Sequence, residues 1–145
     1  MKKILLIFAV LIGVFTASAR DKYSHDVATL PVAARTILKN NFKADVAHIK
    51  IEKSLGSIKE YEVVLNDGSE ITFDSKGNWK DVEVRGNASV PSGLVPDAIT
   101  AFVKKNHKNC TITGLEKNRT NYEVELSNGV EMKFSTDGKF LRYDD

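Results

Sequence analysis

The side chains in this sequence best suited to chemistry are three histidines and one cysteine. His107 and Cys110 stand three positions apart and could share a metal ion. A zinc site, however, uses four protein ligands, or three and a water molecule, and no second pair of ligands is spaced to complete the set. His48 alternates with Ala47 and Ile49 in an expected strand and points away from the apolar side chains. We therefore predict no metal site and no cofactor.

Clusters of Asp, Asn, Ser and Gly also resemble calcium-binding segments. Residues 74–78 read Asp-Ser-Lys-Gly-Asn, like the start of a calcium-binding loop. Lys76 stands where such a loop needs an oxygen ligand, and no glutamate closes the loop. Three more clusters that end in glycine occur at 66–68, 127–129 and 136–138. Tight turns account for all four clusters together, so we interpret them as turns.

Nucleophilic catalysis is not indicated either. None of the Ser, Thr and Cys residues has a histidine neighbour in a recognisable catalytic motif. The sequence contains no glycine-rich phosphate loop and no aromatic-basic patch of the kind that binds nucleic acid. The single cysteine, Cys110, excludes an internal disulfide, and we expect its thiol to be buried and inert. We predict that the chain is not an enzyme and binds no nucleic acid.

The N-terminal segment 1–19 has the three-part order of a signal peptide. Lys2 and Lys3 precede an apolar run over 4–15, and small residues end at Ala19 in an A-x-A pattern. The run is too short for a membrane anchor, which takes about 20 apolar residues. Cleavage after Ala19 would reduce the 21 basic side chains to 19, equal to the 19 acidic ones. We expect an exported protein, periplasmic or secreted, that starts at Arg20 with neither a membrane anchor nor a basic excess.

The remainder of the chain is a duplication. Residues 61–73, YEVVLNDGSEITF, return at 122–134 as YEVELSNGVEMKF, and the upstream segment 30–34 is answered by 95–99. Chance does not reproduce a helix and a hairpin in the same order. The predicted organisation is a signal peptide at 1–19, a first helix-plus-hairpin repeat at 20–85 and a second at 86–145.

Each repeat opens with an amphipathic helix. Pro31 and Pro96 suit the first helical position, where the missing N–H costs nothing. His107 takes the place of Phe42 and is expected to end the apolar stripe of the second helix. Strands are expected at 46–51 and near 111–115, followed by hairpins. Apolar residues recur at helical spacing, namely Leu30, Ala34, Ile37, Leu38 and Phe42, then Val95, Ile99, Phe102 and Val103.

The turns that end in glycine fix the strand register, and the register assigns each side chain to a face. Tyr61 pairs with Phe73, and Phe73 pairs with Trp79 beyond the next turn. One face is therefore apolar and packs against the helices. The expected fold class is α+β, with two tandem helix-β-β-β repeats forming an antiparallel sheet with helices on one face. The open face is expected to carry Glu62, Val64, Glu70, Thr72, Lys80 and Val82, then Glu123, Glu125, Glu131, Lys133, Leu141 and Tyr143.

One expected pairing on the open face is unusual, because Glu125 lies directly opposite Glu131. Like charges in this position destabilise a strand pair by a few tenths of a kcal/mol, up to about 1 kcal/mol. A solvated sheet face tolerates that cost, and the alternative interpretation is an acidic surface for a basic partner. Leu141 and Tyr143 would then be apolar anchors. The candidate partner-binding residues are Glu62, Val64, Glu70, Glu123, Glu125, Glu131, Leu141 and Tyr143.

Both copies of the pattern Y-E-V-x-L-x-[ND]-G-x-E-[IM]-x-F are followed by a glycine and an aromatic residue. In this the chain resembles the PepSY-like, β-lactamase-inhibitor-like family of exported bacterial proteins, from Leu30 to Asp145. The resemblance implies a tandem-repeat inhibitor architecture whose open sheet face grips a partner. It implies no catalytic residues, and it does not imply that this chain inhibits a β-lactamase.

The predicted function is that of a non-catalytic, exported binding or inhibitor-like module. It would contact a protein partner of unknown identity and basic character through the open sheet face. The alternative is a small-ligand or peptide carrier that uses a cleft between the repeats. A carrier needs a deep pocket, whereas protein contact needs a broad, shallow face.

Overall fold

The computed structural model describes residues 21–144, so the predicted signal peptide at 1–19 lies outside the described residues. Two α-helices, nine strands and two short 3-10 helices follow one another along this part of the chain. In order they are β1 (Asp21–Ser24), η2 (Val27–Thr29), α1 (Val32–Asn41), β2 (Val46–Ser54), β3 (Ser57–Leu65), β4 (Glu70–Asp74), β5 (Trp79–Glu83), η3 (Ser92–Leu94), α2 (Asp97–Asn106), β6 (Ile112–Lys117), β7 (Asn121–Leu126), β8 (Glu131–Ser135) and β9 (Phe140–Asp144).

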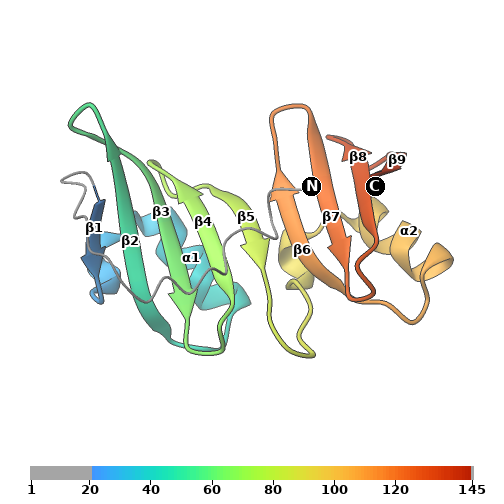
Figure 1. Ribbon diagram of the computed structural model, residues 1–145, viewed down its shortest axis with the longest axis horizontal. Helices are drawn as coiled ribbons and strands as arrows, with labels where there is room; N and C mark the ends of the chain where they lie inside the picture. The colour runs from blue at the N-terminus through green and yellow to red at the C-terminus, as the bar shows by residue number, and fades with distance from the viewer. Residues whose placement is uncertain (1–20, 145) are drawn as a thin grey trace.

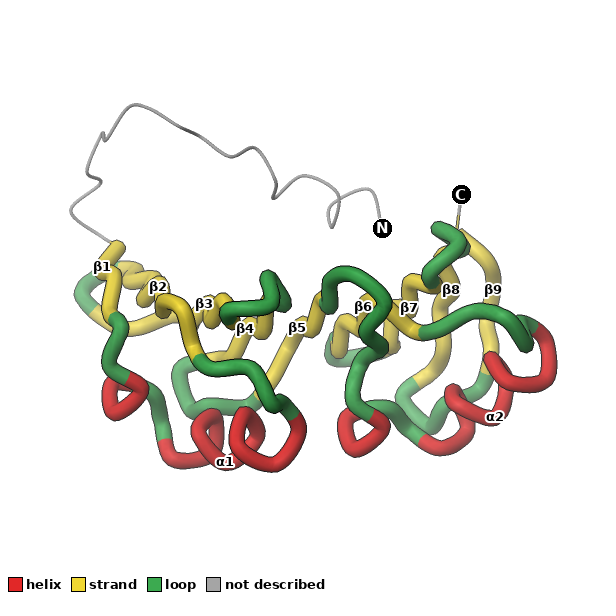
Figure 2. The backbone as a smooth tube through the Cα atoms, turned by 90° about the horizontal axis from the view of Figure 1, so that it is seen from below, coloured by secondary structure: helices red, strands yellow, loops and turns green. Residues whose placement is uncertain are grey.

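The nine strands form one antiparallel sheet whose spatial order equals the chain order, from β1 at one edge to β9 at the other (Figure 1). Both helices lie on the same side of the strands and leave the other face open (Figure 2). The repeats join edge to edge through β5 and β6, which pair at three positions. The predicted α+β class is confirmed. Four strands follow each helix, not the three of the predicted helix-β-β-β unit, because the strands expected at 46–51 and near 111–115 form β2 and β6 and precede the hairpins.

The two helices begin after equivalent prolines. Pro31 and Pro96 have extended backbones and are the N-cap residues of α1 and α2. The prediction placed each proline at the first helical position, and each helix in fact begins one residue later. Each helix buries two residues four positions apart, the spacing of one helical face. These residues are Ala34 and Leu38 in α1, and Ile99 and Val103 in α2.

The turns before β5 and β9 pack against the starts of the helices. Gly77 and Gly138 have φ angles of +88° and +85°, a left-handed conformation that favours glycine. A Cβ atom at Gly77 would lie 2.8 Å from the Cβ of Pro31. At Gly138 it would lie 2.8 Å from the Cβ of Ala98. The same close contact in both repeats agrees with the predicted duplication.

The predicted hairpin register is confirmed in both repeats. Tyr61 pairs with Phe73, and Tyr122 pairs with Phe134. The rings of Phe73 and Phe134 are fully buried in one hydrophobic core that extends under both helices. Packing of this core is therefore the main source of stability in the described part of the chain.

A β-bulge interrupts the pairing of β4 with β5. Lys80, the residue after Trp79, has no partner across the pair, and Asp81 is the residue opposite Thr72. An extra residue turns every later side chain of the strand to the other face. The prediction that Val82 lies on the open face is therefore wrong, because Val82 is fully buried in the core.

The same bulge occurs where β8 pairs with β9. Leu141 has no partner across the pair, and Arg142 lies opposite Lys133. Tyr143 is therefore opposite the buried Met132 and points to the helix side of the sheet. The prediction that Tyr143 lies on the open face is wrong for this reason.

Candidate binding surface

The open face carries a continuous band of carboxylates across the seam between the repeats. These side chains alternate along their strands with buried core residues, so they point away from the helices. We call this set the acidic strip. It consists of Glu70 on β4, Asp81 and Glu83 on β5, Glu116 on β6, Glu123 and Glu125 on β7, and Glu131 on β8.

Carboxylates lie directly opposite one another at four places in the acidic strip. Each such pair costs a few tenths of a kcal/mol, up to about 1 kcal/mol. The four pairs therefore lower the stability of the fold, and the packing of the core offsets this loss. The predicted opposition of Glu125 and Glu131 is one of the four. The pairs are Glu70–Glu83, Asp81–Glu116, Glu116–Glu123 and Glu125–Glu131.

The carboxyl group of Asp81 is strongly perturbed. Burial raises the pKa of Asp81 to about 7, and the negative charges of Glu116, Glu83 and Glu70 add to the increase. Its Oδ1 atom is buried and has no hydrogen-bond partner among residues 21–144. Charge on an unpaired, poorly solvated oxygen is unfavourable. A cation next to Asp81 would therefore favour its ionised form.

Other carboxylates of the strip shift in the same direction. Burial is the first cause of the raised pKa values of Glu70, Glu116 and Glu125, and an acidic residue on the adjacent strand is the second. Arg85 opposes this, because its Nη2 lies 3.6 Å from Oε1 of Glu83 and its charge lowers the pKa of Glu70 and of Glu125. Lys80 likewise lowers the pKa of Glu116, but the seven carboxylates of the strip outnumber these cations, so the strip is negative.

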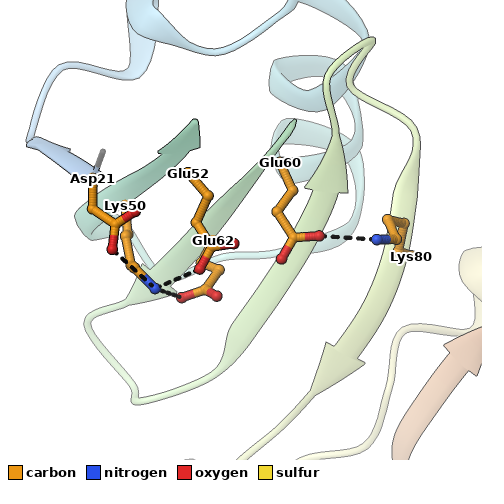
Figure 3. A network of polar contacts seen from close by, with 6 residues as sticks. All are labelled: Asp21, Lys50, Glu52, Glu60, Glu62 and Lys80. Carbon is orange, nitrogen blue, oxygen red and sulfur yellow. Dashed lines mark hydrogen bonds and ion pairs between the residues drawn. The ribbon is translucent and has the colours of Figure 1, made fainter. Parts of the chain in front are cut away.

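On strands β1 to β3 of the open face, the acidic side chains are paired with lysines, one of which, Lys80, reaches over from β5 (Figure 3). Lys80 Nζ lies 2.9 Å from Oε2 of Glu60. Glu62, a predicted partner-binding residue, is already paired with a cation. The Nζ atom of Lys50 lies 2.6 Å from Glu52, 3.5 Å from Glu62 and 3.9 Å from Asp21.

Three of these side chains have the spacing of a metal site. Glu52, Glu60 and Glu62 each offer a carboxylate oxygen within 4.8 Å of the other two. The ammonium groups of Lys50 and Lys80 already neutralise this group of oxygens. A cation would have to displace both lysines, so we interpret the group as an ion-pair network and not as a metal site.

Near β9, Glu123 is also paired. Lys133 Nζ lies 3.2 Å from Glu123 and 3.8 Å from Asp144, and Arg142 Nε lies 2.9 Å from Asp144. Cations thus accompany both ends of the open face. The negative charge of the acidic strip is concentrated around β5 and β6, where the two repeats meet.

The predicted apolar anchors are not gathered beside the acidic strip. Leu141, the extra residue of the second bulge, is 54% exposed. Tyr143 lies on the helix side, where its hydroxyl is 3.2 Å from Nε2 of His107 and its ring packs against Phe140. Val64 is partly buried on β3 of the open face. The structure brings most of the predicted glutamates together but separates the apolar residues from one another.

The two residues considered for zinc have other surroundings. His107 caps the C-terminus of α2 and contacts the Tyr143 hydroxyl, as given above. Cys110 is a free thiol that is only partly buried, which corrects the expected full burial. Within residues 21–144 no group of metal ligands includes His107 or Cys110, so we interpret both residues as structural.

Sequence reasoning missed three residues of the acidic strip, namely Asp81, Glu83 and Glu116. The bulge places Asp81 and Glu83 on the open face, and Glu116 lies beyond the expected end of its strand, because β6 continues to Lys117. The signal that could have found the first two is Asp81-Val82-Glu83, an apolar residue between two acids in period-two alternation.

On the helix side, one pocket lies between the repeats, and we call it the inter-repeat pocket. Its volume is about 450 Å³. Lys117, the last residue of β6, places its Nζ 5.6 Å from the centre of the Trp79 ring, within cation–π range. The pocket is lined by Ala33, Thr36, Ile37, Gly77, Asn78, Trp79 and Lys117.

Known proteins share this sequence pattern and fold. A family model described as "Putative beta-lactamase-inhibitor-like, PepSY-like" matches residues 59–142. A "putative periplasmic protein of unknown function" from Bacteroides vulgatus is 42% identical with a TM-score of 0.79, covering 86% of this chain and 99% of that chain. A "putative calcium-regulated periplasmic protein" from Bacteroides thetaiotaomicron is 32% identical with a TM-score of 0.79, covering 86% and 97%. A second Bacteroides vulgatus protein, described as periplasmic, is 34% identical with a TM-score of 0.77, covering 86% and 97%. No curated protein matches the sequence.

These descriptions confirm the predicted location outside the cytoplasm, periplasmic or secreted. None of the helices within 21–144 is long and apolar enough to cross a membrane. The family model covers more than half of the chain, and both copies of the repeated hairpin pattern lie within the matched residues. The chain therefore belongs to the PepSY-like, β-lactamase-inhibitor-like family.

Proposed function

We propose that this protein is an exported, non-catalytic binding module that holds a basic protein partner against its acidic strip. The observation that carries the proposal is the set of four opposed carboxylate pairs around the seam. Elsewhere on the same face carboxylates also lie opposite one another, as Glu52 and Glu60 do, but there lysines bridge them, as where Lys50 bonds Glu52 and Lys80 bonds Glu60. Like charge that is concentrated in one place lowers stability, and a complementary partner offsets that loss on docking.

A cationic partner would gain more here than at isolated surface carboxylates. Burial raises the pKa of Asp81, of Glu70 and of Glu116, which means that their charged forms are poorly solvated. A lysine or arginine docked on the strip would replace the missing solvation and reduce the repulsion. The inhibitor-like description of the family supports a role by protein contact, without naming an enzyme that is inhibited.

Charge reversal tests the proposal. A tagged double variant with Glu125→Lys and Glu131→Lys should lose capture of partners from a native envelope fraction. The control double variant on the helix side, with Lys39→Glu and Lys104→Glu, should retain capture. Partners identified by mass spectrometry should be basic. They should elute as NaCl rises, because the Debye length is about 8 Å at physiological ionic strength. If the helix-side change abolishes capture and the strip change has no effect, the proposed surface is the wrong one.

Calcium provides a second arm of this experiment. One relative is described as calcium-regulated, and calcium prefers carboxylate oxygens as ligands. Elution with CaCl₂ and with NaCl at matched ionic strength separates a calcium effect on the strip from simple screening. Release by calcium alone would extend calcium regulation to this chain. Equal release by both salts would confine that description to the relative.

The second candidate function is the carrier that was predicted as the alternative. One observation favours it, namely the inter-repeat pocket, which combines α1 and β5 of the first repeat with Lys117 of the second. Its volume of about 450 Å³ falls within the roughly 300–1,000 Å³ of small-molecule sites. The pocket and the acidic strip lie on opposite faces of the sheet, so each function is testable without the other.

A further inference from the structure

We propose that the inter-repeat pocket binds a small carboxylate with a flat apolar body, which stacks on Trp79 and places its carboxylate at Nζ of Lys117. This inference rests on the carrier function named above and not on the acidic strip. It starts from a comparison of the two repeats, because the second repeat fills with its own side chain the space that the first repeat leaves open.

Ile37 and Phe102 occupy equivalent places in α1 and α2. The Nδ2 atom of Asn41 donates a hydrogen bond to the carbonyl oxygen of Ile37 at 2.9 Å. The Nδ2 atom of Asn106 donates to the carbonyl oxygen of Phe102 at 3.0 Å in the same way. The two helices thus carry the same local hydrogen bond, and the side chains at these positions point to corresponding parts of the sheet.

The aromatic residues under these two positions are equivalent as well. Trp79 and Phe140 each open the strand after a glycine turn. In the second repeat, the ring of Phe102 stacks on Phe140 with centroids 4.6 Å apart and an interplanar angle of 9°. In the first repeat, Ile37 takes the place of the stacking ring, and the Lys117 ammonium lies over the Trp79 ring, 5.6 Å from its centre. A flat ligand on Trp79 would take over this contact, restore the stack that the second repeat makes internally, and pair its carboxylate with Lys117.

Lys117 sets the charge of the ligand, because the hydrogen-bond donors of the other polar side chains in the pocket are already used. The Thr36 hydroxyl donates to the carbonyl oxygen of Val32 at 3.0 Å, and Asn78 Nδ2 donates to Oδ2 of Asp74 at 3.1 Å. None of the ion pairs found within 21–144 involves Lys117. Its ammonium group contacts the Trp79 ring and takes part in no ion pair in that part of the chain, so a single carboxylate is its complement at the rim of an apolar pocket.

Trp79 is the only tryptophan in the chain, so its fluorescence reports on this pocket directly. The probes are 3-phenylpropanoate, 3-phenylpropanol and 3-phenylpropylamine, which share one flat body and differ in charge. The carboxylate should give a saturable change in emission, with an affinity about fivefold or more above that of the alcohol. The amine should bind most weakly, because it meets Lys117 with like charge.

Variants locate the effect. Lys117→Met should remove the preference for the carboxylate and leave the weak binding of the alcohol, whereas Lys139→Met, on the second repeat, should change neither. Ile37→Phe should supply the missing ring and reduce binding of all three probes, with the fold checked by circular dichroism. The proposal is overturned if no probe gives a saturable change up to about 10 mM, if acid and alcohol bind alike, or if Lys117→Met keeps the preference.

The two proposed sites fail separately. Reversal of Glu125 and Glu131 to lysine should leave the fluorescence titration unchanged, since these residues lie on the open face. Lys117→Met should leave the capture of protein partners unchanged for the same reason. Unchanged capture by the strip variant would therefore overturn the strip proposal alone, and a missing preference for the carboxylate would overturn the pocket proposal alone.

Discussion

Replacing Asp81 by asparagine should stabilise the protein at neutral and alkaline pH. Asparagine has nearly the same shape as aspartate but carries no charge. Asp81 is opposite Thr72 on one side and Glu116 on the other, with a buried Oδ1 that lacks a hydrogen-bond partner in the described part of the chain. Removing the charge therefore removes repulsion and an unfavourable desolvation without opening a cavity.

The size of the effect follows from the pKa. Burial, together with the charges of Glu116 and Glu83, raises the pKa of Asp81 from 3.8 to about 7. Between these two values the folded chain holds a proton that the unfolded chain has lost, so the free energy of unfolding falls as pH rises through this window. One pKa unit corresponds to about 1.4 kcal/mol, so a rise of about 3 units makes the fall due to Asp81 about 4 kcal/mol.

Urea unfolding from pH 4 to pH 8.5, followed by Trp79 fluorescence, measures this difference. Asp81→Asn and the native protein should agree within about 1 kcal/mol at pH 4, and the variant should be more stable by about 4 kcal/mol at pH 8. Asp137→Asn is the control, because the hydrogen bond from Ser135 lowers the pKa of Asp137. That variant should gain no stability as pH rises. A difference between Asp81→Asn and the native protein that stays constant with pH would refute the reasoning.

Three further predictions concern the core, the turns and export. Phe73→Ala should destabilise the fold by about 3–5 kcal/mol in urea unfolding, and a loss under about 1 kcal/mol would contradict the assigned face. Gly129→Ala should cost about 1–2 kcal/mol from its left-handed backbone alone, because no atom lies within 4 Å of the added Cβ. Gly138→Ala has the same φ of +85° but meets α2 at 2.8 Å, so it should cost more, and equal losses would count against the turn–helix contact. The intact mass of the exported protein should correspond to a chain that begins at Arg20, and a membrane-bound form that retains Met1 would exclude the predicted signal peptide.

The hairpin register could be predicted because a local signal fixes it. A three-residue turn that ends in glycine permits one register, and period-two alternation then assigns every side chain to a face. The opposed pair Glu125 and Glu131 follows from Gly129 and the alternation alone. The duplicated segments 61–73 and 122–134 gave the same predicted register for both hairpins, and the structure has that register in each.

The bulges could not be predicted from these signals. A bulge lets Trp79 and Val82, three positions apart, both face the helices, an arrangement that strict alternation excludes. The turn before β5 contacts the start of α1 through Gly77, a contact between residues distant in the sequence. The local alternation of Asp81, Val82 and Glu83 indicates the face of each side chain, but it does not say at which residue the bulge occurs. The inter-repeat pocket depends on the same tertiary packing, since Lys117 reaches Trp79 only after β6 has paired with β5.

The same bulge occurs in both repeats, but the residue that follows it lies in a different environment in each. In the second repeat, β9 is the edge of the sheet, and Arg142 at this position is 62% exposed and paired with Asp144. In the first repeat, β5 has neighbours on both sides, so Asp81 at the matching position is enclosed between Thr72 and Glu116. Burial follows from the place of the strand in the sheet, because only an interior strand is covered from both sides. The perturbed carboxyl of the acidic strip is therefore created by the joining of the two repeats, and neither repeat contains it alone.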